Sequence, residues 1–229
     1  MPRAGRRPIL KGMTRDQDLR AELLRRAERD QAARQEIGAE AHEGMTRVDG
    51  ENLPWLKQVV ADSGWPGRSA VGEDGADAAW LLVQHADRDP GFQGRCLDLL
   101  TVAVDQGEAT KAQLAFLTDR VLLAEGKPQE FGTQAMARRD QWVVRPLRDP
   151  DGVDQRRAAM SLGPLAENLA RITARHGPPP PIIIACRECA GSVELWPGDD
   201  GDKVNVDCPN CGHSIEIIFG PAVPGSDSR

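Results

Sequence analysis

Residues 177–189 read GPPPPIIIACREC, and this stretch divides the chain into two parts of different character. The four prolines at 178–181 cannot continue a helix and favour a stiff, extended spacer. Apolar residues before them recur at helical spacing, whereas short β-like runs follow them around paired cysteines. The sequence therefore predicts a mainly α protein, with a helical domain (13–176), a proline spacer (177–181) and a small β zinc-ribbon domain (182–220). Residues 1–12 are expected to form a flexible basic arm and residues 221–229 a flexible tail.

The β part carries two C-x2-C pairs, Cys186 with Cys189 and Cys208 with Cys211, and 18 residues separate the pairs. This spacing matches a four-cysteine zinc site. Four thiolates fill the coordination sphere of a tetrahedral zinc ion and leave no position for water or substrate. The zinc is therefore predicted to stabilise the fold. The alternatives are a thiol redox pair and cysteines without a metal.

Charge decides what the ribbon is expected to bind. Residues 181–229 contain three basic and eight acidic side chains, so a phosphate backbone would be repelled. A protein partner contacted through the acidic ribbon, or a purely stabilising role, fits this charge better than nucleic acid. The basic arm offers a few phosphate contacts but no interleaved aromatic residues, so nucleic-acid binding ranks last among the functions considered.

The composition is that of an ordinary globular protein of 229 residues, with 40% hydrophobic residues and a net charge of −6. Its longest apolar stretches fall well short of the ~18 residues that read as a membrane-spanning helix, and no apolar segment of a secretory signal follows the basic start. We expect a cytoplasmic location and no membrane partner. The chain has no P-loop, no G-x-G-x-x-G and no serine or cysteine nucleophile motif, which leaves nucleotide hydrolysis, dinucleotide binding and acyl transfer without support.

Helical spacing and turn residues predict the elements of the two parts. Helices are expected over 14–40, 52–62, 73–87, 91–105, 108–124, 153–160 and 164–175. Strands are expected over 142–144, 182–184, 193–196, 203–206 and 215–219.

Two titratable side chains occupy positions where helical spacing predicts burial. His85 follows Ala78 and Leu81 by seven and four residues, and Asp119 follows Phe116 by three. A buried imidazole needs a partner for its N–H. The structural alternative for His85 is a core histidine satisfied by a carbonyl or carboxylate. The alternative for Asp119 is a structural ion pair with Arg120, Arg156 or Arg157.

Four short motifs, taken in order, resemble the signature of a bacterial domain family of unknown function. They are Trp65-Pro66, Gln84-His85-Ala86, Asp119-Arg120-Val121, and Gln129 with Phe131-Gly132-Thr133-Gln134. The similar family pattern has a G-W-P turn, a helix ending in Q-H-A, a D-R-V helix, a Q-x-Y-G-T-Q loop and a helix with an arginine pair. The resemblance covers about residues 14–175 and implies candidate positions but no reaction. Phe131 stands where the family usually has tyrosine, so a phenol is missing, and the zinc ribbon looks like an addition to the family domain.

The first hypothesis is an enzyme in which His85, Asp119 and Gln134 converge in a pocket. His85 is expected to act as general base or acid and Asp119 to fix its tautomer, with Arg156 or Arg157 holding a small anionic substrate. The residues expected to bind the substrate are Gln84, Arg120, Gln129, Thr133, Arg156 and Arg157. The second hypothesis is a module without catalysis that binds a small anionic ligand or a protein, with the acidic ribbon as docking element.

Overall fold

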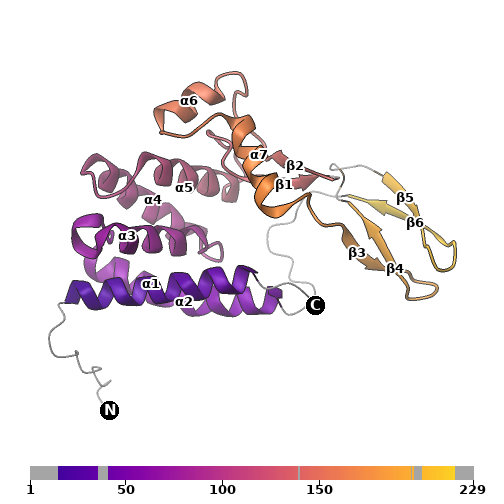
Figure 1. The fold of residues 1–229 in the computed structure, drawn as a ribbon, viewed down its shortest axis with the longest axis horizontal. Helices are drawn as coiled ribbons and strands as arrows, with labels where there is room; N and C mark the ends of the chain where they lie inside the picture. Colours follow the sequence, from indigo (N-terminus) through magenta and orange to yellow (C-terminus); the bar gives the residue numbers. More distant parts are fainter. Residues whose placement is uncertain (1–14, 36–40, 139, 197, 199–202, 220–229) are drawn as a thin grey trace, which may run out of the picture.

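The computed structural model describes residues 15–35, 41–138, 140–196, 198 and 203–219 (Figure 1). The expected arm and tail lie outside these residues. The helices are α1 (Arg15–Gln35), α2 (Ala41–Ser63), α3 (Arg68–Gln84), α4 (Pro90–Asp105), α5 (Lys111–Ala124), α6 (Val153–Ala159) and α7 (Leu165–His176). The strands are β1 (Ala135–Arg138), β2 (Gln141–Val144), β3 (Ile182–Ala185), β4 (Ser192–Leu195), β5 (Lys203–Asp207) and β6 (Ser214–Ile218). A mainly α chain with a small β part is thus confirmed.

Helices α1 to α5 form the body of the molecule (Figure 1). α1 packs against α2 and α3, α3 also packs against α4 and α5, and α4 packs against α5. One apolar core joins these helices, because the side chains removed from water come from all five of them. Its largest buried members are Leu23, Leu56, Val71, Val83, Phe92, Leu100 and Leu117.

Residues 85–89 form a short turn between α3 and α4. α3 ends at Gln84, and the N–H of His85 still donates to the carbonyl of Leu81, at 3.3 Å. α4 begins with a proline, and the Asp89 carboxylate caps it by accepting from the N–H of Phe92 at 2.9 Å. The end of one helix and the cap of the next therefore fix this turn.

α2 is longer than its sequence predicts, since it extends over 41–63 and contains Pro54. The expected range was 52–62, because glycines and a proline inside a helix carry a cost. Side chains of α1 offset this cost along α2. Arg34 pairs with Asp49 at 2.9 Å, and Arg26 donates to the side-chain oxygen of Asn52 at 3.0 Å. α1 itself ends at Gln35, and the rest of its expected range, 36–40, lies outside the described residues.

The strands form three separate antiparallel pairs, β1 with β2, β3 with β4, and β5 with β6. β2 matches the expected strand at 142–144, whereas β1 was not expected. Figure 1 shows β3 to β6 extending away from the helices beyond α7. Among the described helices, none combines the length and apolar character that crossing a bilayer requires.

Candidate functional site

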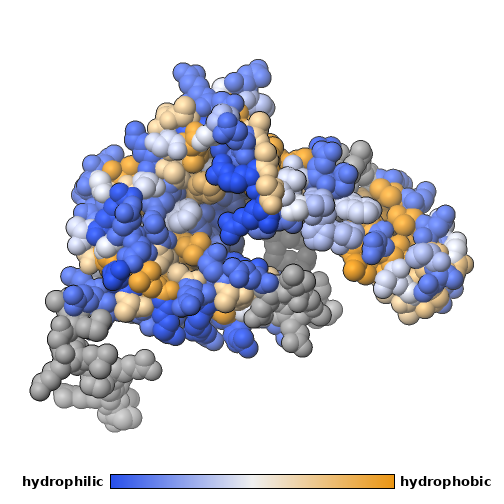
Figure 2. Space-filling view, in the orientation of Figure 1, coloured by the Kyte–Doolittle hydropathy of each residue, from blue (hydrophilic) through white to orange (hydrophobic). Residues whose placement is uncertain are grey.

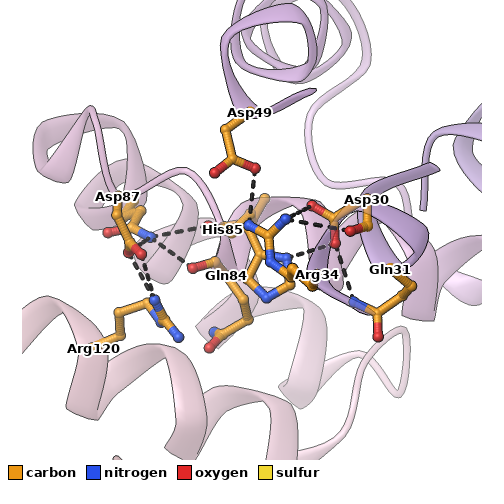
Figure 3. A network of polar contacts seen from close by, with 10 residues as sticks. Asp30, Gln31, Arg34, Asp49, Gln84, His85, Asp87 and Arg120 are labelled. Carbon is orange, nitrogen blue, oxygen red and sulfur yellow. Dashed lines mark hydrogen bonds and ion pairs between the residues drawn. The ribbon is translucent and has the colours of Figure 1, made fainter. Parts of the chain in front are cut away.

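His85 lies beside a buried carboxylate of α1. Its Nδ1 is 2.8 Å from an oxygen of Asp30, whose side chain is 1% exposed, whereas the imidazole is 18% exposed (Figure 3). A carboxylate oxygen accepts hydrogen bonds, so Nδ1 of His85 donates to Asp30. Within the described part of the chain, Nε2 has no hydrogen-bond partner. The ring is thus held at one nitrogen and open at the other.

Further side chains of α1 and α2 hold Asp30 in place. Arg34 forms an ion pair with Asp30 at 2.8 Å and a second with Asp49 at 2.9 Å, so that one guanidinium bridges two carboxylates (Figure 3). Gln31 donates to the same Asp30 oxygen that His85 contacts, at 3.1 Å. Since buried charges need partners, these contacts hold the Asp30 carboxylate in place beside the imidazole.

A second polar cluster occupies the other side of the α3–α4 turn. Both oxygens of Asp87 accept from Nη1 of Arg120, at 2.6 and 2.8 Å, and Nη2 of the same arginine lies 3.3 Å from the side-chain oxygen of Gln134. Gln93 donates from one amide nitrogen to Asp87 and to the main-chain carbonyl of Gln84, at 3.1 and 3.2 Å. The carbonyl contact links this cluster to the residue beside His85.

Two donors in this region lack an acceptor. Nε2 of Gln84 and Nε of Arg120 are buried, and neither finds a hydrogen-bond partner among the described residues. A buried N–H without a partner costs about 1–3 kcal/mol. Gln84 precedes His85 in the chain, and Arg120 contacts Asp87 and Gln134, so both donors lie around the α3–α4 turn.

The sequence predicts Asp119 beside His85, but the structure places its carboxylate against the loop 130–133. Its two oxygens accept three main-chain N–H groups, those of Glu130 at 2.8 Å, Phe131 at 3.0 Å and Thr133 at 2.8 Å. The side chain is 0% exposed and fully engaged by this loop. The carboxylate at Nδ1 of His85 is Asp30, so the idea that Asp119 fixes the tautomer is wrong. Successive residues of α5 point about 100° apart, which sends Arg120 toward the α3–α4 turn and Asp119 toward the loop.

Gln129 and Thr133 belong to the same loop. Gln129 is fully buried, accepts the N–H of Gln134 at 3.0 Å and donates to the carbonyls of Gln134 and Arg145, at 3.0 and 2.9 Å. The Thr133 hydroxyl accepts from the Gln134 amide at 3.1 Å. These contacts hold the loop and position Gln134.

The two arginines expected to hold an anion contact main-chain carbonyls. Arg156 donates to the carbonyl of Glu130 at 2.8 Å and to Asp149, and Arg157 donates to the carbonyls of Phe131 and Gly163, at 2.7 and 2.6 Å. Burial lowers the pKa of the Arg157 guanidinium, against the opposing effect of nearby carboxylates. Their contacts support the loop that Asp119 also holds and leave no sign of an anion site.

Six residues of the site are not among those predicted from the sequence, namely Asp30, Gln31, Arg34, Asp49, Asp87 and Gln93. Asp30 had a signal, because it lies seven residues after Leu23 and three after Ala27, on the apolar side of α1. A carboxylate at such a position is exceptional and needs a partner. Asp87 follows two residues after His85. The partners of these side chains come from other helices, so spacing along the chain alone does not identify them.

The four cysteines of the β part converge as their spacing predicts. Their sulfur atoms all lie within 4.8 Å of one another, with Cys186 and Cys211 3.7 Å apart and Cys189 and Cys208 3.5 Å apart. Four sulfurs at about 2.3 Å from a tetrahedral ion are about 3.8 Å from each other. The four ligands therefore fit a single metal ion.

The two cysteine turns have the same hydrogen-bond pattern. Cys186 and Cys208 donate from their N–H to the carbonyls of Gly191 and His213, at 2.8 and 2.9 Å. Main-chain N–H groups of the turn lower the pKa of the Cys186 thiol. Burial raises the pKa of Cys208, but the main-chain N–H groups that follow it outweigh this and bring the pKa to about 7. Neighbouring thiols raise the pKa of Cys189 and bring that of Cys211 to about 12, so the first cysteine of each turn is the one that loses its proton more easily.

Comparison with known proteins places the helical part in a family. A family model described as a family of unknown function, DUF6624, matches residues 17–177, and the chain belongs to this family. The match ends at the proline spacer and does not include the cysteine turns. No curated protein and no solved structure matches the chain.

Proposed function

We propose that the helical part of this DUF6624 member is an acid–base enzyme for a small anionic substrate, with His85 as the residue that accepts or donates the proton. One observation carries the proposal: Nδ1 of His85 lies 2.8 Å from the buried Asp30, while Nε2 has no partner in the described residues. Asp30 selects the tautomer and holds the ring, and the proton moves at Nε2. Asp30 thus takes the positioning role first expected of Asp119.

The substrate is proposed to bring an oxygen to the two buried donors that lack an acceptor, Nε2 of Gln84 and Nε of Arg120, once the side chains that cover them move aside. A carboxylate or phosphate oxygen would remove the cost of leaving these buried N–H groups unpaired. Gln134 contacts Arg120 and completes the polar lining. Arg156 and Arg157 take no part in this proposal because their donors serve carbonyls of the loop and Asp149.

Proton transfer at His85 is tested by exchange with solvent. Simple 2-oxo and 2-hydroxy carboxylates and phosphate esters are incubated with the protein in D2O, and proton NMR follows loss of C–H signals and formation of products. We expect turnover of a member of this panel and a loss of about 10²- to 10⁴-fold in His85→Gln. His42→Gln, on the exposed surface of α2, is the matched control and should leave the rate unchanged. Turnover that survives in His85→Gln would contradict the proposal, as would a panel without any turnover.

We also propose that the metal held by Cys186, Cys189, Cys208 and Cys211 is zinc, with a stabilising role. A complete set of four thiolates and sulfur separations of 3.5 and 3.7 Å support a closed tetrahedral site. Native mass spectrometry of the purified chain should find one zinc ion. Cys208→Ser should lose it, whereas Cys96→Ala, which removes the buried thiol of α4, should retain it.

A second candidate function, a docking module, is supported by apolar side chains exposed on the ribbon. Ile183 is 64% exposed and Ile218 is 58% exposed, and Ile182 and Trp196 are also open. Figure 2 shows apolar side chains gathered over the strands of this part. Exposed apolar side chains next to acidic ones suit a protein partner with a basic rim. Co-purification of a stoichiometric basic protein, lost in Ile183→Glu, would favour docking; a catalytically active chain without such a partner would favour the enzyme.

A further inference from the structure

An open cavity of about 650 Å³ lies along the seam between α1 and α3 and is bordered by the start of α5. Its floor is apolar and consists of Leu24 and Ala27 from α1 and of Ala78, Trp80 and Leu81 from α3. The indole N–H of Trp80 donates to the carbonyl of Gln113 at 3.0 Å, which fixes the ring at the wall. We call this cavity the α1–α3 groove.

The rim of the α1–α3 groove is acidic. Four carboxylates line it, those of Glu28, Glu73, Asp74 and Asp77, against the single guanidinium of Arg68. Asp74 is paired with Arg20. Glu73 is 75% exposed and 3.4 Å from Arg68, and Glu28 has no partner among the described residues. An occupant of this groove needs apolar side chains for the floor and positive charges for the rim.

We propose that the α1–α3 groove binds the chain's own segment 3–11, RAGRRPILK. The segment has this chemistry: Pro8, Ile9 and Leu10 suit the apolar floor, while Arg6, Arg7 and Lys11 on either side suit the carboxylates of the rim. It carries four positive charges and no negative one. The match is thus one of apolar character and charge in the same short stretch.

The connection is long enough for this contact. The groove begins at Leu24, nine residues or ~14 Å along α1 from Arg15, and ends at Gln31, ~24 Å from Arg15. Leu10 and Ile9 precede Arg15 by five and six residues, so an extended connection lets them reach ~17–20 Å from it, and Arg6, nine residues before Arg15, reaches ~30 Å. Because the segment belongs to the same chain, its effective concentration at the groove is in the millimolar range, so weak contacts suffice.

Occupation of the groove would bring the segment close to the candidate site. Gln31 lines the groove and also donates to Asp30, and Leu81 lies one helical turn before His85. The binding itself does not depend on the proposed reaction, and it is tested without measuring activity.

The test uses the chain without residues 2–12 and a synthetic peptide of residues 1–14. Calorimetry should find saturable one-to-one binding to the shortened chain, weaker at high salt, and at least tenfold weaker binding to the full chain, whose own segment competes. Glu28→Lys and Glu73→Lys in the shortened chain should each weaken binding about three- to tenfold. Asp98→Lys, on the exposed surface of α4, is the control and should not.

Three results would overturn the proposal. The first is equal affinity of the full and shortened chains for the peptide. The second is an effect of Asp98→Lys as large as that of Glu28→Lys, which would mean unspecific attraction. The third is a full chain that is dimeric at micromolar concentration and monomeric without residues 2–12, because the segment would then bind a second copy.

Discussion

Asp30 and Asp119 are two carboxylates buried to the same degree, 1% and 0% exposed, and their partners are of opposite kinds. Asp119 accepts three main-chain N–H groups of one loop, and every oxygen has its partner. Asp30 contacts the side chains of Gln31, Arg34 and His85, and the far nitrogen of His85 is open. Both oxygens of Asp119 are thus used by the main chain of one loop, whereas the contacts of Asp30 lead to His85, whose Nε2 has no partner among the described residues.

The partners of a buried carboxylate decide whether its removal damages the fold or changes the chemistry of a neighbouring side chain. Where the backbone is irregular, a carboxylate can accept the main-chain N–H groups that secondary structure would otherwise satisfy. Removing such a carboxylate damages the fold. A carboxylate that orients an imidazole adds little to the fold and much to the chemistry of the ring. The four predictions that follow rank side chains by how many main-chain groups depend on them.

Asp119→Ala should have the largest effect. It leaves three buried N–H groups without an acceptor, and hydrogen bonds to a charged group are worth about 1.5–3 kcal/mol each, so we expect a loss of about 3–5 kcal/mol in the free energy of unfolding. Urea denaturation followed by circular dichroism measures it. Asp98→Ala, exposed on α4, is the control and should change the free energy by less than about 0.5 kcal/mol. A loss below 1 kcal/mol for Asp119→Ala would remove the basis of the comparison.

Arg157→Met should rank second. Arg157 is 2% exposed and supports the other side of the same loop through the carbonyls of Phe131 and Gly163. Methionine keeps much of the buried stem but leaves these acceptors unpaired, so we expect a loss of about 2–3 kcal/mol. Arg156→Met is the matched comparison and should lose about 1 kcal/mol, because its side chain is 23% exposed and water can replace it. Equal losses for the two variants would show that burial does not decide the effect.

Asp89→Ala tests a carboxylate with a single main-chain donor. The side chain caps α4 by accepting from the N–H of Phe92, and it pairs with Lys57. Both contacts lower the pKa of Asp89, and the larger effect comes from Lys57. We expect a loss of about 1 kcal/mol at pH 7. Because the folded pKa is lowered, this stability is present above the unfolded pKa of about 3.9 and disappears as the pH falls through the folded pKa. The difference between variant and parent should therefore shrink as the pH falls below about 4, and a constant difference would contradict the role of the ionised carboxylate.

Much of the fold could be predicted because its signals are local. The proline spacer, the cap of α4, the Thr110–Gln113 capping box of α5 and the two cysteine turns each lie within a few residues of sequence. α2 was predicted too short because its first half depends on α1, through contacts such as Arg34 with Asp49. Helix propensity depends on the residues of the helix itself and contains no information about partners on another helix.

The same limit applies to the site. Helical spacing identified His85 and Asp119 as polar residues at buried positions, and both are indeed partnered. Spacing gives the face of a helix but not the neighbour that this face meets. Asp119 was therefore assigned to His85, although both of its oxygens accept N–H groups of a loop 11 to 14 residues further along the chain. Asp30 lies 55 residues before His85, and only the packing of α1 on α3 brings them together.

His85→Gln should change stability least. The imidazole is partly exposed and contributes one hydrogen bond, worth about 0.5–1.5 kcal/mol net, and Asp30 keeps Arg34 and Gln31 as partners when the ring is lost. We expect a change below about 1 kcal/mol in the free energy of unfolding, measured by urea denaturation beside Asp119→Ala. Under the proposed function, the variant with the smallest effect on the fold is then the one with the largest loss of turnover. A loss as large as that of Asp119→Ala would instead make the pair of His85 and Asp30 a structural contact, and the open nitrogen an ordinary surface group.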